Sequence, residues 1–411
     1  MKIAVKRLIR DEKGQTMILA LILLVVGGLI MAPLLAYMNT GLITGEVYER
    51  RTDELYAADA GVEDALWQLK QLEPDPDIPT TPEKPPLTYT LNSTVNDKTI
   101  EVTIDMISGT QGGGIYKVTS TATSAGGSNT TIESYVQTMP LFWNNAITST
   151  SDITLQPDSE VYGDVMGNLT GPGGEPAGTV YGNTSGPYDA DKWPFSGNFS
   201  AIYWPQASNA TLPHDGCCGG KCTLDVAVNS TFGPGFHDGN LGDLYIASSS
   251  NDVITANLTG TVYIKGDGAR LYIGAGTGSK EFYLDLNYQT IYVEGKNYDL
   301  DSNGNALYVD KSVHLIGSGV IIAEGNIDFH PTMDLANEDD FIFVMSLFGG
   351  VQFFPNGTVY GSVAARDVYL GSGTVLTHTD APTDPDTGES LLNFPMNAVE
   401  CAVKILTWDI S

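Results

Sequence analysis

The chain has 411 residues and a formal net charge of −29, with 49 acidic against 20 basic side chains. A surface this acidic would repel nucleic-acid phosphates, so the composition argues against DNA or RNA as a partner and is compatible with divalent cations. Glycine is abundant (46 residues) and only 17% of the residues are charged, which favours a β-rich extracellular exterior built from Ser, Thr, Asn and Gly.

The first predicted element is a helix that begins in a membrane. No charged residue occurs from Met17 to Met38, and an apolar run of this length allows one helix to cross about 30 Å of hydrocarbon. Residues 1–14 carry five basic and two acidic side chains, and the rest of the chain carries 15 and 47. Because the basic residues lie on one side of the apolar run, we expect a single-pass protein with a cytoplasmic N-terminus and its bulk outside the cell.

The helical pattern continues beyond the membrane segment. Apolar and small residues recur at spacings of three and four, and proline is absent between Pro33 and Pro74. The resulting stripe consists of Leu55, Ala58, Val62, Ala65, Leu66 and Leu69. We therefore expect one helix over residues 15–72, apolar all round in its first half and amphipathic in its second, with weak points at Gly27-Gly28 and Pro33.

Several features of this N-terminus together resemble type IV pilin-like proteins, closest to PilX-like minor pilins and pseudopilins. They are a basic leader over residues 1–14 that ends in Gly14, the amide residue Gln15, the apolar helix, and the stretch LYAADAGVEDAL at 55–66. The resemblance implies cleavage after Gly14 by a prepilin peptidase, and assembly with other pilin-like subunits through the helix. Leu19 stands at the fifth mature position, where most major pilins have Glu, so a minor or tip-type subunit is favoured. An uncleaved signal anchor and a flexible-pilus (Tad-like) pseudopilin are the alternatives.

A small antiparallel sheet is predicted to follow. Residues 73–86 contain six prolines, which predicts an extended linker. Residues 87–140 contain four alternating segments rich in Thr, Val, Ile and Tyr, separated by Asn-Asp or Gly-rich turns. We expect these four strands to pack against the helix stripe as an α+β unit.

Residues 141–411 change to short apolar triplets bounded by Gly, Asp, Asn or Ser. Examples are LYI at 244–246, LYI at 271–273 and LYV at 307–309. Strands this short with a corner after each predict a β-solenoid, in which aliphatic residues stack inward and the central Tyr faces outward. The region resembles the β-helices of bactofilin-like and polysaccharide-lyase-like proteins. A β-sandwich explains the same short strands and is the alternative, and an insertion is expected near 171–239.

The cysteines predict disulfide bonds. The four are Cys217, Cys218, Cys222 and Cys401. Outside the cell, disulfides are the default use of cysteine. Adjacent cysteines rarely bridge each other, so the expected pairs are Cys222 with one of its two neighbours and the remaining one with Cys401. A metal site that includes His214 and His237 is the other interpretation.

Residues 299–310 match the pattern of a calcium-binding loop. Oxygen ligands stand at positions 1, 3 and 5, Gly304 at position 6 allows the turn, and a carboxylate stands at position 12. The candidate ligands are Asp299, Asp301, Asn303, Asn305 and Asp310. Asp at position 12 instead of Glu predicts weak binding, and a polar turn without an ion is the alternative. We expect no other cofactor.

Catalysis finds no support in the motifs. The chain contains no H-E-x-x-H, no G-x-S-x-G and no phosphate-binding loop. We therefore expect a minor pilin or pseudopilin-like surface subunit that displays a β-rich domain for assembly or adhesion, with surface polysaccharide as a potential ligand. The alternative is a membrane-anchored, polysaccharide-active β-helix enzyme, which convergent acids in a cleft would favour.

Overall fold

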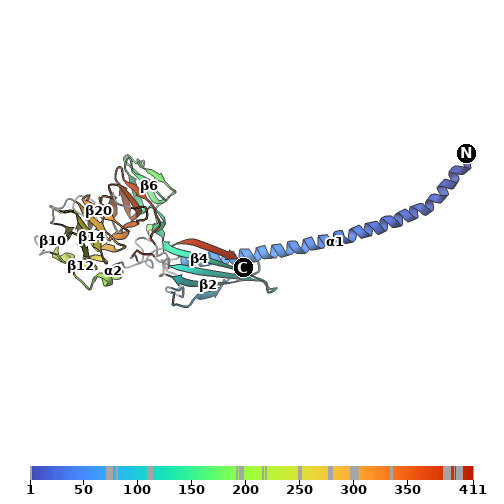
Figure 1. Cartoon of the computed structure of the whole chain (residues 1–411), viewed down its shortest axis with the longest axis horizontal. Coiled ribbons are helices and arrows are strands. Elements are labelled where there is room, and N and C mark those ends of the chain that lie inside the picture. Colours follow the sequence, from blue (N-terminus) through green and yellow to red (C-terminus); the bar gives the residue numbers. More distant parts are fainter. Residues whose placement is uncertain are drawn as a thin grey trace.

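The structure is a computed structural model of the chain. It describes residues 2–70, 77–79, 82–108, 114–190, 193, 199–214, 217, 220–248, 252–275, 281–296, 305–333, 337–382, 390–392, 394 and 401–410. A long helix leads to a small antiparallel sheet, and a large all-β region with parallel strands lies beyond it (Figure 1). The N-terminus lies at the far end of the helix and the C-terminus beside the small sheet (Figure 1).

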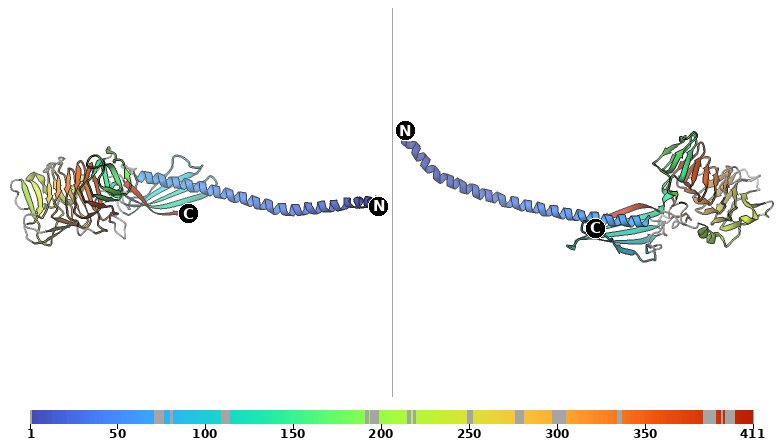
Figure 2. Two further views of the ribbon diagram at one scale, coloured as in Figure 1. Left: turned by 90° about the horizontal axis from the view of Figure 1, so that it is seen from above. Right: turned by 180° about the vertical axis from the view of Figure 1, so that it is seen from behind.

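Helix α1 extends without interruption over Lys2–Leu69. Its 68 residues correspond to about 100 Å at 1.5 Å per residue. The helix begins earlier than the predicted residue 15 and ends three residues before the predicted residue 72. Pro33 lies inside it, and the helix curves without a break (Figure 2).

The apolar segment of α1 is exposed. The described large apolar side chains between Met17 and Met38 are 47–80% exposed, with Val26 and Tyr37 at the two limits. In the part of the chain that the structure describes, this is the one helix long and apolar enough to cross a membrane. Exposed apolar surface on this scale requires a lipid or protein neighbour.

The second half of α1 packs on an antiparallel sheet. The strands are β1 (Leu87–Thr90), β2 (Thr99–Ser108), β3 (Ile115–Thr123), β4 (Asn129–Pro140) and β28 (Cys401–Ile410), in that order across the sheet. Ala58, Val62 and Ala65 of the helix stripe are at most 1% exposed. They pack against the inward-facing row of the sheet, which includes Val102 and Val118. The four strands predicted over 87–140 are present with the expected antiparallel pairing.

The fifth strand corrects the prediction. Residues 401–410 were expected to belong to the solenoid, but β28 pairs with β4 in antiparallel register, with Cys401 opposite Pro140 and Ile410 opposite Ile132. Figure 1 shows β28 in red beside β4. The small sheet is therefore built from segments on both sides of the parallel β region, which is inserted between β4 and β28.

The proline-rich segment also differs from the prediction. Ile78 is 1% exposed and belongs to the same core as Val62. The hydroxyl of Tyr116 donates to the carbonyl oxygen of Pro79 at 3.3 Å, and the ammonium of Lys84 donates to that of Ile78 at 2.9 Å. The described residues of this segment thus pack on the helix and sheet instead of forming a separate linker.

The region that follows is all-β, as the sequence predicts. Its described strands form three parallel ladders. The first ladder contains β12 (Gly235–Asp238), β15 (Val262–Lys265), β18 (Thr290–Val293), β21 (Gly319–Ala323), β23 (Ile342–Ser346), the end of β25 (Thr358–Ala365), the starts of β5 (Ile147–Leu155) and β7 (Val165–Thr170), and β9 (Thr184–Ser185). The second contains β10 (Lys221–Asp225), β13 (Asp243–Ala247), β16 (Leu271–Ile273), β19 (Leu307–Val309), β22 (Ile327–Phe329), β24 (Gly350–Phe353), β26 (Asp367–Leu370), and the ends of β5 and β7. The third contains β11 (Ser230–Phe232), β14 (Ile254–Leu258), β17 (Phe282–Asp285), β20 (Val313–Ile316), the start of β25, β27 (Val375–Thr377), β6 (Glu160–Tyr162) and β8 (Thr179–Tyr181).

The Tyr-centred triplets occupy matching positions in the second ladder. Leu244, Leu271 and Leu307 lie side by side, and so do the tyrosines and the aliphatic residues that follow them. In each triplet the outer two residues are buried and the Tyr is partly exposed. The alternation expected from the sequence is therefore present.

The position of the strands along the stack does not follow their order in the sequence. β5 pairs with β25 and β26, and β7, β8 and β9 complete that end of the stack. The next ladder strand, β10, lies at the opposite end. The intervening residues 186–214, called the strap below, include α2 (Phe199–Ala207), which lies beside β12 (Figure 1). Because strands on both sides of the strap belong to the ladders, the insertion is shorter than the predicted 171–239.

One short 3-10 helix joins the two units. η1 (Leu141–Asn144) connects β4 to β5, and its Trp143 is 3% exposed. The indole packs against Phe341, Phe343 and Phe394, with ring centroids 5.3–6.0 Å away. The other described 3-10 helix, η3 (Gly239–Leu241), links β12 to β13. Trp143 therefore anchors the point where the chain enters the parallel region beside the segment by which it leaves.

Candidate functional site

The stretch that carries the pilin resemblance lies where α1 contacts the sheet. A Cβ on Gly61 would lie 2.7 Å from Cγ2 of Ile100 and would overlap Oγ of Ser120. Small residues on this face let the helix backbone approach the strands closely. Glu54, 3% exposed, accepts hydrogen bonds from the hydroxyls of Ser128 and Thr130, so its buried carboxylate is paired.

The predicted processing site falls within α1. The structure describes the helical backbone at Gly14 and Gln15, and the side chain of Gln15 lies outside the described features. Cleavage between these two residues stays a prediction.

A groove of about 510 Å³ lies between α1 and the end of the small sheet. Its lining is Val47, Arg50, Arg51, Glu54, Leu55, Ser128, Asn129, Thr130 and Ile410. The neighbouring apolar residues of β28 are also exposed, including Trp408 at 44% and Ile410 at 51%. The bare helix surface thus continues onto the sheet edge.

One of the predicted disulfides is present. Cys217 and Cys222 are bonded, with Cα atoms 4.3 Å apart, so Cys217 is the partner of Cys222 among the two that the sequence left open. Cys218 lies outside the described residues, and only the backbone of Cys401 is described. The second bridge stays a prediction.

Of the five predicted calcium ligands, the structure describes Asn305 and Asp310. Asp299, Asp301 and Asn303 lie outside the described residues. Asn305 donates from its amide to Asp328 at 3.3 Å, and its own buried Oδ1 has no partner among the described residues. Asp310 accepts from the backbone and hydroxyl of Ser312 at 2.9 and 2.6 Å. Burial alone would raise the pKa of Asp310, but these hydrogen bonds outweigh it and lower the pKa. The unpaired Oδ1 of Asn305 and the ionised carboxylate of Asp310 are oxygen donors of the kind that calcium prefers. Calcium binding stays a prediction.

A row of aromatic rings follows the outer face of the second ladder. Neighbouring centroids are 4.8–5.7 Å apart along Tyr245, Tyr272, Tyr308, His330, Phe354 and Tyr369. Two neighbouring pairs, Tyr272–Tyr308 and His330–Phe354, are stacked with interplanar angles of 7° and 10°, and the other three pairs are tilted by 32–42°. Burial, together with the charge of Asp310, raises the pKa of Tyr272 and Tyr308 to about 12, so both are hydrogen-bond donors at neutral pH.

A polar groove of about 460 Å³ opens beside this row. It is lined by Lys221, Asp243, Tyr245, Arg270, Leu271, Tyr272, Asn305 and Tyr308. The ammonium of Lys221 lies 4.8 Å from the centroid of the Tyr245 ring. Hydrogen-bond donors, acceptors and aromatic surface are therefore combined in one depression.

The aromatic residues of the strap are not an exposed platform. Tyr203 is fully buried and packs against Tyr292 of β18, with ring centroids 5.3 Å apart. Trp204 contacts Phe236 and Tyr263 at 5.0 and 5.3 Å. These described rings of the strap therefore share one cluster with Tyr263 and Tyr292 of the first ladder and bury them.

Two glutamates beneath the strap were not singled out from the sequence. Glu294 accepts hydrogen bonds from Ser200 at 2.7 Å, from the hydroxyl of Tyr263, and from the backbone of Gly266 at 2.6 Å. Glu324 accepts from Tyr292 at 2.8 Å, and burial raises its pKa, partly offset by that hydrogen bond and by Lys296. Each follows a first-ladder strand directly, and this shared position is the signal that could have identified them.

Comparisons with known proteins give little further information. No protein-family model matches the chain, and no curated protein matches it. The chain is similar in structure to a solved pilin. This is the competence-associated pilin ComZ from Thermus thermophilus, with 11% sequence identity and a TM-score of 0.24 over 87% of this chain and 97% of that chain. A score this low carries no argument about function, so the function must be inferred from the residues and their geometry.

Proposed function

We propose that the chain is a minor pilin or pseudopilin-like subunit of a surface filament or secretion pseudopilus, which displays the parallel β region outside the cell. The observation that carries this proposal is the division of α1. Its segment from Met17 to Met38 is apolar and exposed, and its C-terminal part packs on a small sheet through small residues such as Ala58 and Gly61. A helix of this kind can pass from a membrane into a bundle of similar helices while its folded head stays outside.

We further propose that the parallel region is a β-solenoid. Three ladders of short parallel strands, visited in turn, and the aligned triplets of the second ladder support this. The inward-facing aliphatic residues of all three ladders belong to a single cluster, as expected where coils stack around one core. Val320 and Ile322, on the other face of the first ladder, belong to a second cluster beneath the strap. A solenoid inserted between β4 and β28 would extend outward from the filament surface.

Adhesion to surface polysaccharide is the proposed role of this domain, and catalysis is not proposed. Asp243 is the one acid among the described residues that line the groove beside the aromatic row, whereas glycoside cleavage generally needs two positioned carboxyl groups. Tyr245→Leu should weaken retention on immobilised polysaccharide, while Tyr283→Leu, which changes a ring of the third ladder, should not. Equal retention of both variants would contradict a polysaccharide site in this groove.

The processing step tests the filament assignment. N-terminal sequencing of protein from assembled material should begin at Gln15. Gly14→Val should block cleavage, because the peptidase must accommodate a small, flexible residue at this position. Gly41→Val, in the exposed part of the same helix, is the matched control and should be processed normally. An intact Met1 in assembled filaments would reduce the N-terminus to a simple membrane anchor.

A further inference from the structure

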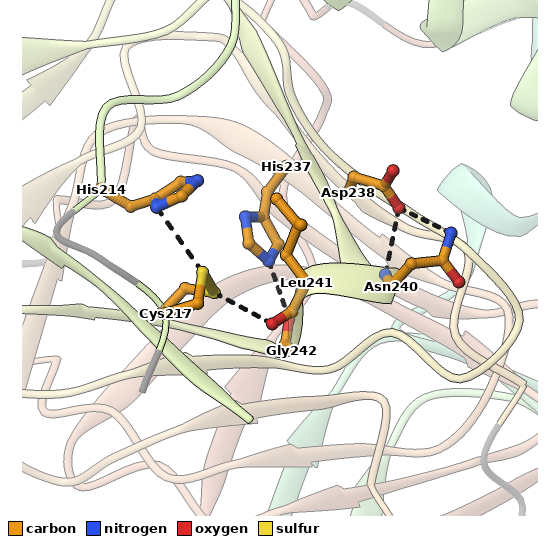
Figure 3. Close-up of a disulfide and its surroundings, with 8 residues drawn as sticks. His214, Cys217, His237, Asp238, Asn240, Leu241 and Gly242 are labelled. Carbon is orange, nitrogen blue, oxygen red and sulfur yellow. Dashed lines mark hydrogen bonds between the residues drawn. A yellow bond between two sulfur atoms is a disulfide. The ribbon is translucent and has the colours of Figure 1, made fainter. Parts of the chain in front are cut away.

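The Cys217–Cys222 disulfide and the neighbouring His214 together offer the donor atoms of a metal site (Figure 3). The donor atoms of His214, Cys217 and Cys222 all lie within 4.8 Å of one another. Zinc–ligand bonds of about 2.0–2.3 Å in a tetrahedron place donor atoms about 3.3–3.8 Å from each other. Small side-chain movements would therefore bring these three donors around one ion. A tetrahedral protein site needs a fourth donor.

His237 of β12 is positioned to be that donor. It is fully buried, and its Nε2 lies 2.8 Å from the carbonyl oxygen of Gly242. A proton on Nε2 leaves the lone pair on Nδ1, and this buried Nδ1 has no hydrogen-bond partner among the described residues. Buried polar atoms are normally paired, so the unpaired nitrogen requires an explanation.

The orientation of His237 explains its unpaired Nδ1 as a metal ligand. Figure 3 shows the second ring nitrogen on the side that faces His214 and the disulfide, and the two imidazole centroids are 5.2 Å apart. Metal-binding histidines commonly donate their other ring N–H to a backbone carbonyl, which fixes the tautomer and the ring plane. Gly242 does this for His237.

We propose that His214, Cys217, Cys222 and His237 bind one zinc ion when the disulfide is reduced. A dithiol reductant is oxidised to its own disulfide and gives two electrons and two protons to the Cys217–Cys222 bond, which becomes two thiols. Zinc binding then releases the two thiol protons and leaves two thiolate and two neutral imidazole ligands. Because both states use the same two sulfur atoms, zinc and the disulfide exclude each other.

Either state would secure the same end of the parallel stack. Cys222 lies in β10, the terminal strand of the second ladder, and Cys217 packs against the central core. Terminal coils of stacked repeats need a cap that shields the core from water and from edge pairing. The proposed ion would keep this cap closed in surroundings that reduce disulfides.

Zinc uptake by the full-length chain in detergent tests the proposal. Protein reduced with a phosphine should bind one Zn²⁺ per chain, and oxidised protein should bind none at this position. Co²⁺ in place of Zn²⁺ should give thiolate-to-metal charge-transfer absorption in the reduced protein only. Cys218→Ser should leave both results unchanged. Absence of Zn²⁺ uptake by the reduced chain would overturn the proposal.

Histidine variants test the ligand assignment. His237→Gln can keep a side-chain donor toward Gly242 but lacks the ring Nδ1, and His214→Ala removes the more accessible imidazole. Each should weaken Zn²⁺ binding by the reduced protein at least tenfold, since a ligand is lost. His314→Gln, on β20, is the control and should bind as the wild type does. Melting of each oxidised variant reports folding separately. Unchanged affinity in either His237→Gln or His214→Ala would overturn the four-ligand site.

Discussion

Gly61 of helix α1 approaches strand β2 so closely that a Cβ on it would lie 2.7 Å from Cγ2 of Ile100. Gly61→Ala should therefore force the helix and sheet apart, and such overpacking costs about 1–3 kcal/mol. Thermal unfolding of the detergent-solubilised chain should show a lower melting temperature for the antiparallel unit.

A second glycine of the same helix provides the control. A Cβ on Gly45 would have no atom within 4 Å. Gly45→Ala should be neutral or stabilise the helix by up to about 1 kcal/mol, because Ala loses less backbone entropy than Gly. Equal destabilisation by both substitutions would show that close packing at Gly61 is not the cause.

Glu294 should hold the strap on the first ladder. Glu294→Ala removes the carboxylate that accepts from Ser200, Tyr263 and the backbone of Gly266, and a hydrogen bond to a charged group contributes about 1.5–3 kcal/mol. We expect faster limited proteolysis within residues 186–214 and a lower melting temperature of the parallel region. Glu175→Ala, on an exposed turn, should change neither. Unaltered proteolysis of the Glu294 variant would mean that ring packing alone retains the strap.

His237 should make the oxidised protein sensitive to mild acid. Its pKa is lowered in the folded state, chiefly by burial, so the unfolded chain takes up the proton first as the pH falls. The contribution of neutral His237 to the free energy of unfolding is fully present above the ordinary histidine pKa of about 6.5. It is lost as the pH falls toward the lower pKa of the folded state, by at most about 1.4 kcal/mol per pH unit. Denaturant unfolding at pH 7.5, 6.5 and 5.5 should show a steeper loss of stability for the wild type than for His237→Gln. The same loss of stability with falling pH in the wild type and in His237→Gln would contradict a role of His237.

Calcium should stabilise the parallel region weakly. With Asp310 at the twelfth loop position, we expect a dissociation constant of about 10⁻⁴–10⁻³ M. Binding to the folded state at ten times that concentration adds about 1.4 kcal/mol. Millimolar Ca²⁺ should raise the melting temperature, and Asp301→Ala should abolish the rise. Asp339→Ala, an exposed acid elsewhere, should retain it. Equal melting with Ca²⁺ and with a chelator would identify the loop as an acidic turn.

The sequence by itself determined the elements whose signals are local. The apolar run from Met17 and the small-residue stripe through Ala58 and Val62 predicted α1, and the alternating segments of 87–140 predicted the four strands β1–β4. The triplets predicted short strands with buried outer residues. These predictions hold because helix and strand periodicity depends on neighbouring residues and on which side chains must leave water.

Only the tertiary structure decided which distant segments meet. Nothing local marks β28 as the partner of β4, or places β10 at the opposite end of the stack from β9. Tyr263 and Tyr292 have the same outward position as the partly exposed Tyr245, yet the strap buries them. The pairing of Cys217 with Cys222, and the position of His237 beside them, depend on the same folding path. Backbone pairing is nearly independent of side-chain identity, so an edge strand can accept many segments. The choice among them is made by the packing of the whole chain.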